Sequence, residues 1–178
     1  MMARVMKWAT MVFFGLTVAF TAFIFTNSIW ALPCAITFGT CFYHFAMRLW
    51  IGCLVEHVMH NTADYEKPWY QLHSFETRLY RLLKVKKWKG RMPTYDPSCF
   101  DPKLHSWERI VQAMCQAEIV HEVIVVFSFL PLLAAIPFGA FGVFLITSLL
   151  AALYDLCFVI MQRFNRPRII KLLKKERA

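Results

Sequence analysis

The chain has 178 residues, of which 58% are hydrophobic and 17% are charged, and its 20 Lys and Arg outnumber its 11 Asp and Glu. A soluble domain averages about 25% charged residues, so the composition excludes an ordinary soluble protein. With 17 Phe but only 6 Gly and 8 Pro, the chain is neither disordered nor fibrous. The length corresponds to one domain, and we predict a single all-α integral membrane domain over residues 1–178.

The first apolar segment covers residues 8–30 and carries no charge. About 20 apolar helical residues cross a hydrocarbon core, so this segment predicts a transmembrane helix. A cleaved signal peptide is the alternative, because Arg4 and Lys7 form a short basic region before it. The apolar run is longer than a signal-peptide core and no small-residue cleavage site follows it, so we interpret the segment as a retained span.

Three further apolar segments predict transmembrane helices, at residues 33–60, 110–136 and 138–162. Helices are the expected structure, because every backbone polar group must be satisfied within lipid. The segment 33–60 contains several ionisable residues, so whether it crosses fully or bends back stays open. A tight turn at residues 137–139 separates the last two predicted spans.

The basic residues lie mainly in the segments that join and flank these four spans. Ten lie in the loop 61–109 and seven in the tail 163–178, whereas the two short turns contain none. The positive-inside rule then predicts that both termini and the loop 61–109 are cytoplasmic. The net charge of +9 is therefore interpreted as an orientation and lipid-contact signal, and we expect membrane lipids and no nucleic acid as partners.

The loop and the tail each predict a surface helix. In the loop 61–109, apolar residues recur at Phe75, Leu79 and Leu82 with helical spacing, and basic residues occupy much of the remaining surface. This pattern is typical of an amphipathic helix at the headgroups of an anionic leaflet. In the basic tail 163–178, Pro167 is expected to end the preceding helix, because the residue before proline is pushed out of the helical region.

Ionisable residues inside the predicted spans are candidates for a functional site. A charge near the centre of a span costs about 2.5–3.5 kcal/mol on insertion scales, so each needs a partner or a function. The residues concerned include His44, Arg48, Glu118, His121, Glu122 and Asp155. Glu118, His121 and Glu122 share a helix face, and a carboxylate beside a histidine is the minimum for general base catalysis. An Arg48–Glu122 pair that only holds two helices together is the structural alternative.

A metal site is a further alternative. Glu118-x-x-His121 has the spacing found in di-iron bundles, and Glu56, His57 and His60 would be needed to complete a ligand set. Since Glu56 and His60 lie near the membrane edge, several turns from His121, we predict no metal. The six cysteines show no zinc-binding spacing, and we interpret them as free thiols.

Three segments resemble the family of small membrane acyltransferases typified by glycosyl-4,4'-diaponeurosporenoate acyltransferase. They are VKKWK at residues 85–89, AEIVH at 117–121 and QRFNRPR at 162–168, and their order and spacing agree with the family over residues 73–175. The resemblance implies a multi-pass protein of the bacterial cell membrane that moves a fatty acyl group onto a sugar hydroxyl of a glycolipid-like acceptor. The matching segments imply site positions at Glu118, His121, Trp88, Lys89, Asn165 and Arg166.

We therefore hypothesise a membrane acyltransferase in which His121 is the general base. Glu118 or Glu122 is expected to orient His121, and Arg48 to stabilise developing negative charge or to hold a donor phosphate. Glu122 stands where the family example has tryptophan, and Arg48 lies outside the well-matched region. The residues expected to bind substrate are His44, Lys86, Trp88, Lys89, Asn165, Arg166 and Asp155.

No cofactor is expected, and the substrates follow from the charge distribution and the resemblance. The basic residues near the surface are expected to attract an anionic donor, acyl-CoA or acyl carrier protein. The resemblance implies that the acceptor is a glycolipid or a glycosylated isoprenoid, as in carotenoid biosynthesis. The alternative function is a non-catalytic membrane partner or assembly protein, in which the intramembrane charges form structural ion pairs.

Overall fold

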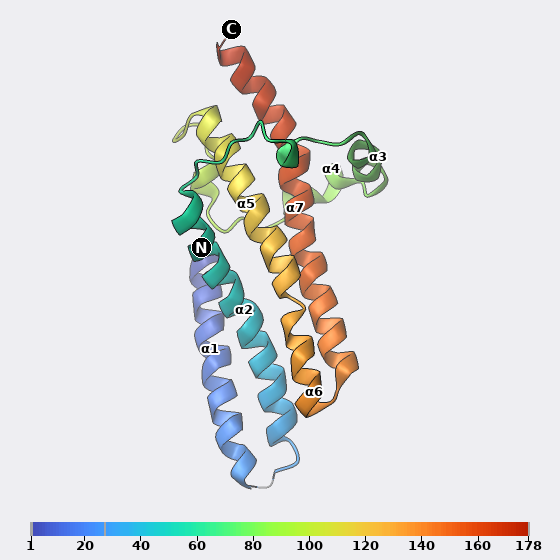
Figure 1. Ribbon diagram of the computed structural model, residues 1–178. Helices are drawn as coiled ribbons and strands as arrows, with labels where there is room; N and C mark the ends of the chain where they lie inside the picture. Colours follow the sequence, from blue (N-terminus) through green and yellow to red (C-terminus); the bar gives the residue numbers. More distant parts are fainter. Residues whose placement is uncertain (1, 27, 178) are drawn as a thin grey trace.

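The computed structural model describes residues 2–26 and 28–177, and every regular element within them is a helix. Four helices are long and apolar enough to cross a membrane (Figure 1). They are α1 (Met2–Phe23), α2 (Ala31–Met59), α5 (Trp107–Phe127) and α7 (Phe141–Arg177). The prediction of an all-helical chain with four membrane-length helices is confirmed, whereas the membrane side of the termini stays a prediction.

Short helical pieces complete the described chain. They are η1 (Ile24–Thr26), η2 (Pro68–Tyr70), α3 (Ser74–Leu82), α4 (Val85–Trp88), η3 (Lys89–Arg91), η4 (Pro97–Phe100), η5 (Leu130–Ala134) and α6 (Ala135–Phe138). The helical spacing expected from Phe75 onward corresponds to α3. Its buried side carries Glu76 and Tyr80, while Phe75 and Leu82 are exposed. Location of α3 at a membrane interface stays a prediction.

The helix α1 packs against α2 through aromatic rings. Phe13 stacks on Phe38 and Phe45, with ring centroids 6.3 and 5.6 Å apart, and Phe20 stacks on Phe38 at 5.4 Å. No residue of α1 is fully buried, so this helix lies at the outside of the bundle. Phenylalanine rings supply a large contact area without polar atoms, which explains how a helix with so little burial is held in place.

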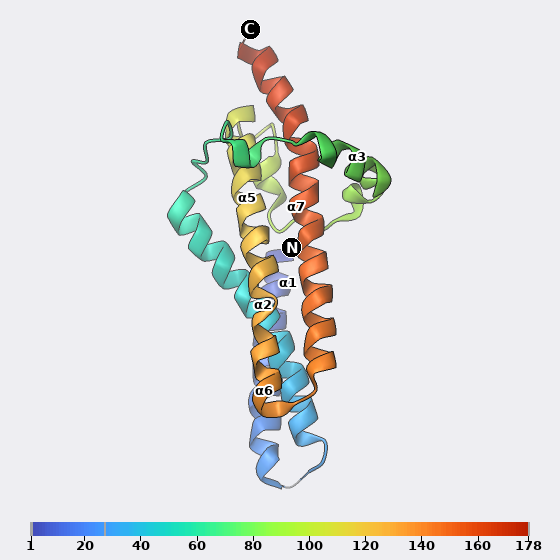
Figure 2. The ribbon, with the colours of Figure 1, turned by 45° about the vertical axis from the view of Figure 1, so that its right-hand side comes forward.

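The helices α5 and α7 run antiparallel and lie side by side in both views (Figures 1 and 2). The helix α2 packs against α5 through a core of Met47, Ile51, Val55 and Ile124. Both short turns lie at one end of the bundle, while the connection 60–106 and the C-terminus lie toward the other end (Figure 1). This arrangement places α2, α5 and α7 around a shared interior, where the ionisable residues meet.

The first span differs from its predicted bounds, and the third consists of several helical pieces. The helix α1 covers residues 2–23 rather than 8–30, because α2 begins at Ala31 and the chain needs the intervening residues to reverse direction. The third membrane-length segment covers Trp107–Phe138, close to the predicted 110–136, but it is divided: α5 ends at Phe127, and the 3-10 helix η5 (Leu130–Ala134), which contains Pro131, follows. Proline lacks the N–H that a continuing α-helix requires, which accounts for this break.

The prediction that Pro167 ends a helix is wrong, since α7 continues through this residue to Arg177. Proline leaves the carbonyl of residue 163 without its helical N–H partner, so other contacts must hold the helix together. Arg166 lies directly before Pro167 and is buried in ion-pair contact with α5. Beyond it, Leu173 is buried and Arg177 pairs with Glu108 at 2.7 Å. Packing against α5 on both sides of the proline therefore outweighs its local preference.

Candidate functional site

A carboxylate in the bundle interior joins three helices. Asp155 of α7 lies 2.9 Å from Nδ1 of His121 on α5, and its second oxygen accepts a hydrogen bond from the guanidinium of Arg48 on α2. Arg48 also donates to the carbonyl oxygens of His44, at 2.8 Å, and Ala151, at 3.5 Å. We call Arg48, His121 and Asp155 the interior triad.

Asp155 is the most deeply buried side chain of the interior triad, and His121 is the most exposed. The side chain of Asp155 is 1% exposed, whereas those of Arg48 and His121 are 15% and 22% exposed. The imidazole of His121 stacks flat on Phe158, with centroids 4.5 Å apart and planes 8° apart. The carboxylate and the aromatic ring together fix the histidine, while part of its imidazole stays accessible.

The hydrogen-bonding capacity of an ionised carboxylate defines the histidine tautomer. A carboxylate can only accept, so His121 donates from Nδ1–H to Asp155 and its Nε2 carries the free lone pair. The second oxygen of Asp155 accepts from the guanidinium of Arg48, so both carboxylate oxygens have a partner. A histidine held in this way has the geometry of a general base.

The partners of His121 and Arg48 differ from those expected. The sequence predicted Glu118 or Glu122 as the carboxylate beside His121, and Glu122 as the structural partner of Arg48, whereas Asp155 is bonded to both. Residues three and four apart on α5 share a broad face, but each is directed at a different neighbour. Glu122 instead accepts a hydrogen bond from Nε1 of Trp69 at 3.1 Å.

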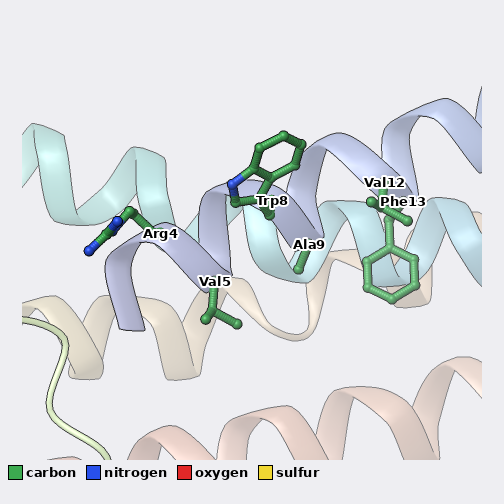
Figure 3. Close-up of a pocket in the computed structure, with 6 residues that line it drawn as sticks. All are labelled: Arg4, Val5, Trp8, Ala9, Val12 and Phe13. Carbon is green, nitrogen blue, oxygen red and sulfur yellow. The ribbon is translucent and has the colours of Figure 1, made fainter. Parts of the chain in front are cut away.

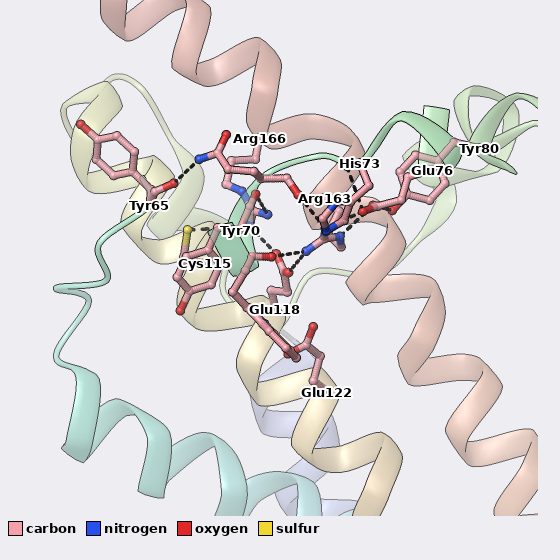
Figure 4. Close-up of polar contacts among 12 residues, drawn as sticks. Tyr65, Tyr70, His73, Glu76, Tyr80, Cys115, Glu118, Glu122, Arg163 and Arg166 are labelled. Carbon is pink, nitrogen blue, oxygen red and sulfur yellow. Dashed lines mark hydrogen bonds and ion pairs between the residues drawn. The ribbon is translucent and has the colours of Figure 1, made fainter. Parts of the chain in front are cut away.

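A second ionic cluster lies toward the end of the bundle from which the connection 60–106 emerges (Figure 4). Glu118 of α5 pairs with Arg163 at 2.6 Å and with Arg166, both of α7, and Arg163 also pairs with Glu76 of α3 at 2.6 Å. Two carboxylates therefore face two guanidinium groups. We call Glu76, Glu118, Arg163 and Arg166 the strap cluster.

The strap cluster fastens the connection 60–106 to the membrane helices. Arg163 donates to the carbonyl oxygens of Trp69 and Gln71 at 2.8 and 2.9 Å, in addition to its two carboxylates. Arg166 donates to the carbonyl oxygen of Tyr70 at 2.5 Å and lies over the tyrosine ring, 5.2 Å from its centroid. The segment 69–76 is thus held as a strap across α5 and α7.

Burial and ion pairing shift the pKa values of the strap residues. Burial alone would raise the pKa of Glu76, but hydrogen bonds from Arg163, Tyr80 and the His73 N–H outweigh it and lower this pKa to about 2. Burial raises the pKa of Tyr70 to about 12, with further contributions from Cys115 and Glu118. Glu76 is therefore ionised and Tyr70 neutral throughout the physiological range.

The QRFNRPR and VKKWK segments meet where Lys89 of η3, directly after α4, contacts α7. Lys89 donates to the side-chain oxygen of Asn165, and its ammonium lies 5.0 Å from the ring centroid of Phe164. Arg168 lies over the same ring at 4.9 Å. Trp88 donates from Nε1 to the carbonyl oxygen of Leu83 at 3.1 Å. These contacts bring two of the three segments that carry the family resemblance into one place.

A basic hollow of about 390 Å³ lies beside this contact. Its lining includes Arg81, Lys84, Lys86 and Lys87 together with the ring of Phe164. No salt bridge joins any of these four basic side chains to an acidic group within residues 2–26 and 28–177. The surface of the hollow is mainly apolar, and the basic residues that line it therefore have no acidic partner among the described residues.

A larger hollow of about 680 Å³ is unrelated to either ionic cluster. It is lined by α1 alone, including Arg4, Trp8 and Phe13 (Figure 3). Its surface is apolar apart from Arg4, and it holds no pair of groups capable of acid–base chemistry. Across the described part of the chain, no three His, Cys, Asp or Glu side chains are grouped closely enough to hold a metal ion. Glu56 instead accepts a hydrogen bond from Gln116.

Sequence reasoning found the residues of the interior triad but missed two members of the strap cluster. Neither Glu76 nor Arg163 was predicted as a site residue, although Arg163 lies both in the basic tail and in a segment that carries the family resemblance. A usable signal was present, because Arg163 and Arg166 both lie within the QRFNRPR segment. Arginines three apart share one helix face, which indicates a common acidic partner.

Comparison with known proteins identifies one family. The family model described as glycosyl-4,4'-diaponeurosporenoate acyltransferase matches residues 66–175. The match includes His121, Asp155 and the whole strap cluster, but neither His44 nor Arg48. No curated protein and no solved structure matches the chain.

Proposed function

Because the chain belongs to the glycosyl-4,4'-diaponeurosporenoate acyltransferase family, we propose that it is a membrane enzyme that moves a fatty acyl group from a thioester donor onto a hydroxyl group. The acceptor is a glycolipid or a glycosylated isoprenoid, in keeping with the lipid named by the family. The observation that carries the proposal is the hydrogen bond between Asp155 and Nδ1 of His121 in the interior of the helix bundle. It supplies a general base where a lipid hydroxyl can reach it.

His121 performs the proton transfers in the proposed reaction. Its Nε2 takes the proton of the acceptor hydroxyl as the hydroxyl oxygen forms a bond to the carbonyl carbon of the donor. The carbon–sulfur bond then breaks, the electron pair stays on sulfur, and the thiolate takes the proton from Nε2. The products are an ester and a free thiol. Asp155 stabilises the imidazolium formed between the two steps, and Arg48 holds Asp155 in position.

The basic hollow provides a binding place for the donor. Acyl-CoA and acyl carrier protein both carry phosphate, and the hollow presents Lys86 and Lys87 beside Phe164. Lys89, bonded to Asn165, and Arg168 extend the positive surface around the same ring. Positive charge without an acidic partner raises the local concentration of an anionic ligand. The carbon chain would extend from there toward the interior triad.

The proposal places the basic hollow and the strap on the cytoplasmic side of a bacterial cell membrane. The connection 60–106 and the C-terminus lie toward the same end of the bundle, and both are rich in Lys and Arg, which the positive-inside rule assigns to the cytoplasm. The exposed Phe75 and Leu82 of α3 would lie among the lipid headgroups. A soluble anionic donor and a membrane-bound acceptor then meet at one enzyme.

The test is acyl transfer in membranes that contain the wild-type protein or His121→Ala. Labelled acyl-CoA is supplied with a glycolipid extract, and the esterified product is measured by mass spectrometry. Loss of a general base is expected to lower the rate about 10²–10⁴-fold. Equal product from folded His121→Ala would remove His121 from the mechanism, and absence of any product from the wild type would reject the proposed activity.

A non-catalytic assembly protein is the second candidate function. It is supported by the pairing of the intramembrane charges with one another. Arg48 has a full partner in Asp155, as a purely structural pair would. The two functions differ in their response to exchange of the charges. The double variant Arg48→Asp, Asp155→Arg keeps the ion pair, so a structural role would survive it. A catalytic role would not, because His121 would face a cation.

A further inference from the structure

Two buried polar side chains in the bundle interior lack a hydrogen-bond partner among the described residues. Both ring nitrogens of His44 and the hydroxyl of Ser148 are unpaired, and these residues are 8% and 0% exposed. More than nine-tenths of buried backbone groups and most buried side-chain polar atoms in proteins are paired. Ser128 follows this rule: it is equally buried and donates to the carbonyl oxygen of Ile124 at 2.8 Å. His44 and Ser148 therefore require an explanation that Ser128 does not.

Helix register places the two unpaired residues at one depth, next to the interior triad. The helices α2 and α7 both run away from the end of the bundle with the short turns (Figure 1). Arg48 of α2 contacts Ala151 and Asp155 of α7. His44 lies four residues before Arg48 and Ser148 three before Ala151, so each is displaced in the same direction by about 4.5–6 Å. Both residues therefore lie about one helical turn from that contact.

The chemistry of the pair selects an uncharged oxygen as its ligand. A neutral imidazole and a hydroxyl each provide one donor and at least one acceptor, and His44 and Ser148 are not bonded to each other. Two donors at one depth of the bundle interior suit an oxygen atom that lies between α2 and α7. The interior triad is already balanced in charge, so an additional ion in this apolar region would lack a counter-ion.

We propose that His44 and Ser148 form a binding site for the carbonyl oxygen of the acyl group during transfer, which rests on the function proposed above. When the acceptor hydroxyl attacks, this oxygen gains negative charge, and hydrogen bonds from the His44 N–H and the Ser148 O–H stabilise it. Donors fixed in a dry interior are effective because they need no reorganisation as the charge develops. The charge returns to sulfur when the carbon–sulfur bond breaks, and neither residue changes its protonation.

The experiment compares Ser148→Ala with Ser128→Ala in the full-length protein in detergent or membranes. Acyl transfer from acyl-CoA is measured as kcat and KM, and thermal unfolding is recorded for each variant. Loss of one such donor is expected to lower kcat about 10²–10³-fold, with little change in KM for the donor or in Tm. Ser128→Ala removes an equally buried hydroxyl that already has a partner and is expected to keep its kcat.

Further variants keep the test decisive. Ser148→Thr retains the hydroxyl and is expected to recover most of the kcat, and His44→Gln, which retains an N–H, is expected to lose less than His44→Leu. A fall in Tm with unchanged kcat for Ser148→Ala would identify an internal water only and would overturn the proposal. So would unchanged kcat and Tm. Loss of activity in His121→Ala but not in Ser148→Ala rejects this site alone, whereas an inactive wild type rejects the acyl transfer itself.

Discussion

Asp155 accepts a hydrogen bond from Nδ1 of His121 at 2.9 Å while its other oxygen is held by Arg48. Each of the three residues comes from a different membrane-length helix, so the geometry of the histidine depends on the packing of α2, α5 and α7 together. In this arrangement the base is supported by a carboxylate that is itself fixed by a cation.

Substitution of Asp155 should impair catalysis more than substitution of Glu122. Asp155→Asn removes the acceptor that selects the Nδ1–H tautomer of His121, and kcat is expected to fall by about 10²–10⁴-fold. Glu122→Gln should have a smaller effect, because Glu122 contacts Trp69 and not His121. Both rates are measured with labelled acyl-CoA in membranes. A larger loss in Glu122→Gln would instead support Glu122 as the orienting carboxylate.

Removal of Glu118 should destabilise the protein strongly. Glu118→Gln would leave Arg163 and Arg166 with one carboxylate fewer, and Glu118 and Arg166 are 0% and 1% exposed. Breaking a buried ion pair by removing one partner costs about 3–5 kcal/mol, measured as the free energy of unfolding in detergent. The matched control is Glu108→Gln, because Glu108 pairs with Arg177 in an exposed ion pair. This variant should have the same free energy of unfolding as the wild type. Equal stability of the two variants would contradict a structural role for the strap cluster.

Acid should release the strap before the membrane helices unfold. The pKa of Glu76 is lowered to about 2 in the folded protein from an ordinary value near 4.5. Its contribution to stability is therefore present above pH 4.5 and is lost as the pH falls toward 2. Cleavage within the connection 60–106 by an acid-active protease should increase as the pH falls from 4.5 toward 2. In Glu76→Gln the connection should already be cleaved readily at pH 4.5 and above. If its cleavage depends on pH as in the wild type, Glu76 does not hold the strap.

Reversal of charge in the basic hollow should weaken donor binding without altering the chemical step. The double variant Lys86→Glu, Lys87→Glu is expected to raise KM for acyl-CoA about 10-fold or more, with kcat retained. The effect should diminish at high salt, because exposed charges are screened. Lys174→Glu, an exposed residue of α7 outside the hollow, is the control. A similar rise in KM for both variants would indicate a general effect of net charge.

The long helices were predictable because apolar runs report directly on membrane length. The choice of ion-pair partners was not, because it depends on how α5 and α7 are aligned. Glu118 and His121 were correctly placed on one helix face, yet one meets Arg163 and the other meets Asp155. Adjacent turns of one helix meet different turns of its neighbour, and the sequence of α5 alone does not contain that information.

Pro167 shows a second physical limit of sequence reasoning. Proline is a local signal for the end of a helix, whereas the contacts that keep α7 continuous join residues far apart in the chain. Arg163 contacts Glu76 across 87 positions, and Arg177 contacts Glu108 across 69 positions. The tertiary contacts therefore outweigh the local preference of Pro167 for the end of a helix.

The separation of Arg48 from Asp155 has a consequence for biogenesis. The two residues lie 107 positions apart, so α2 is synthesised well before the helix that carries its counter-ion. At about 5–20 residues per second, Arg48 waits roughly 5–20 s for Asp155 to leave the ribosome. During that interval the first hairpin carries an uncompensated charge, at a cost of about 2.5–3.5 kcal/mol at the centre of a membrane. The site is therefore completed only by the last helix. A chain that ends before Asp155 contains an intramembrane arginine without its counter-ion.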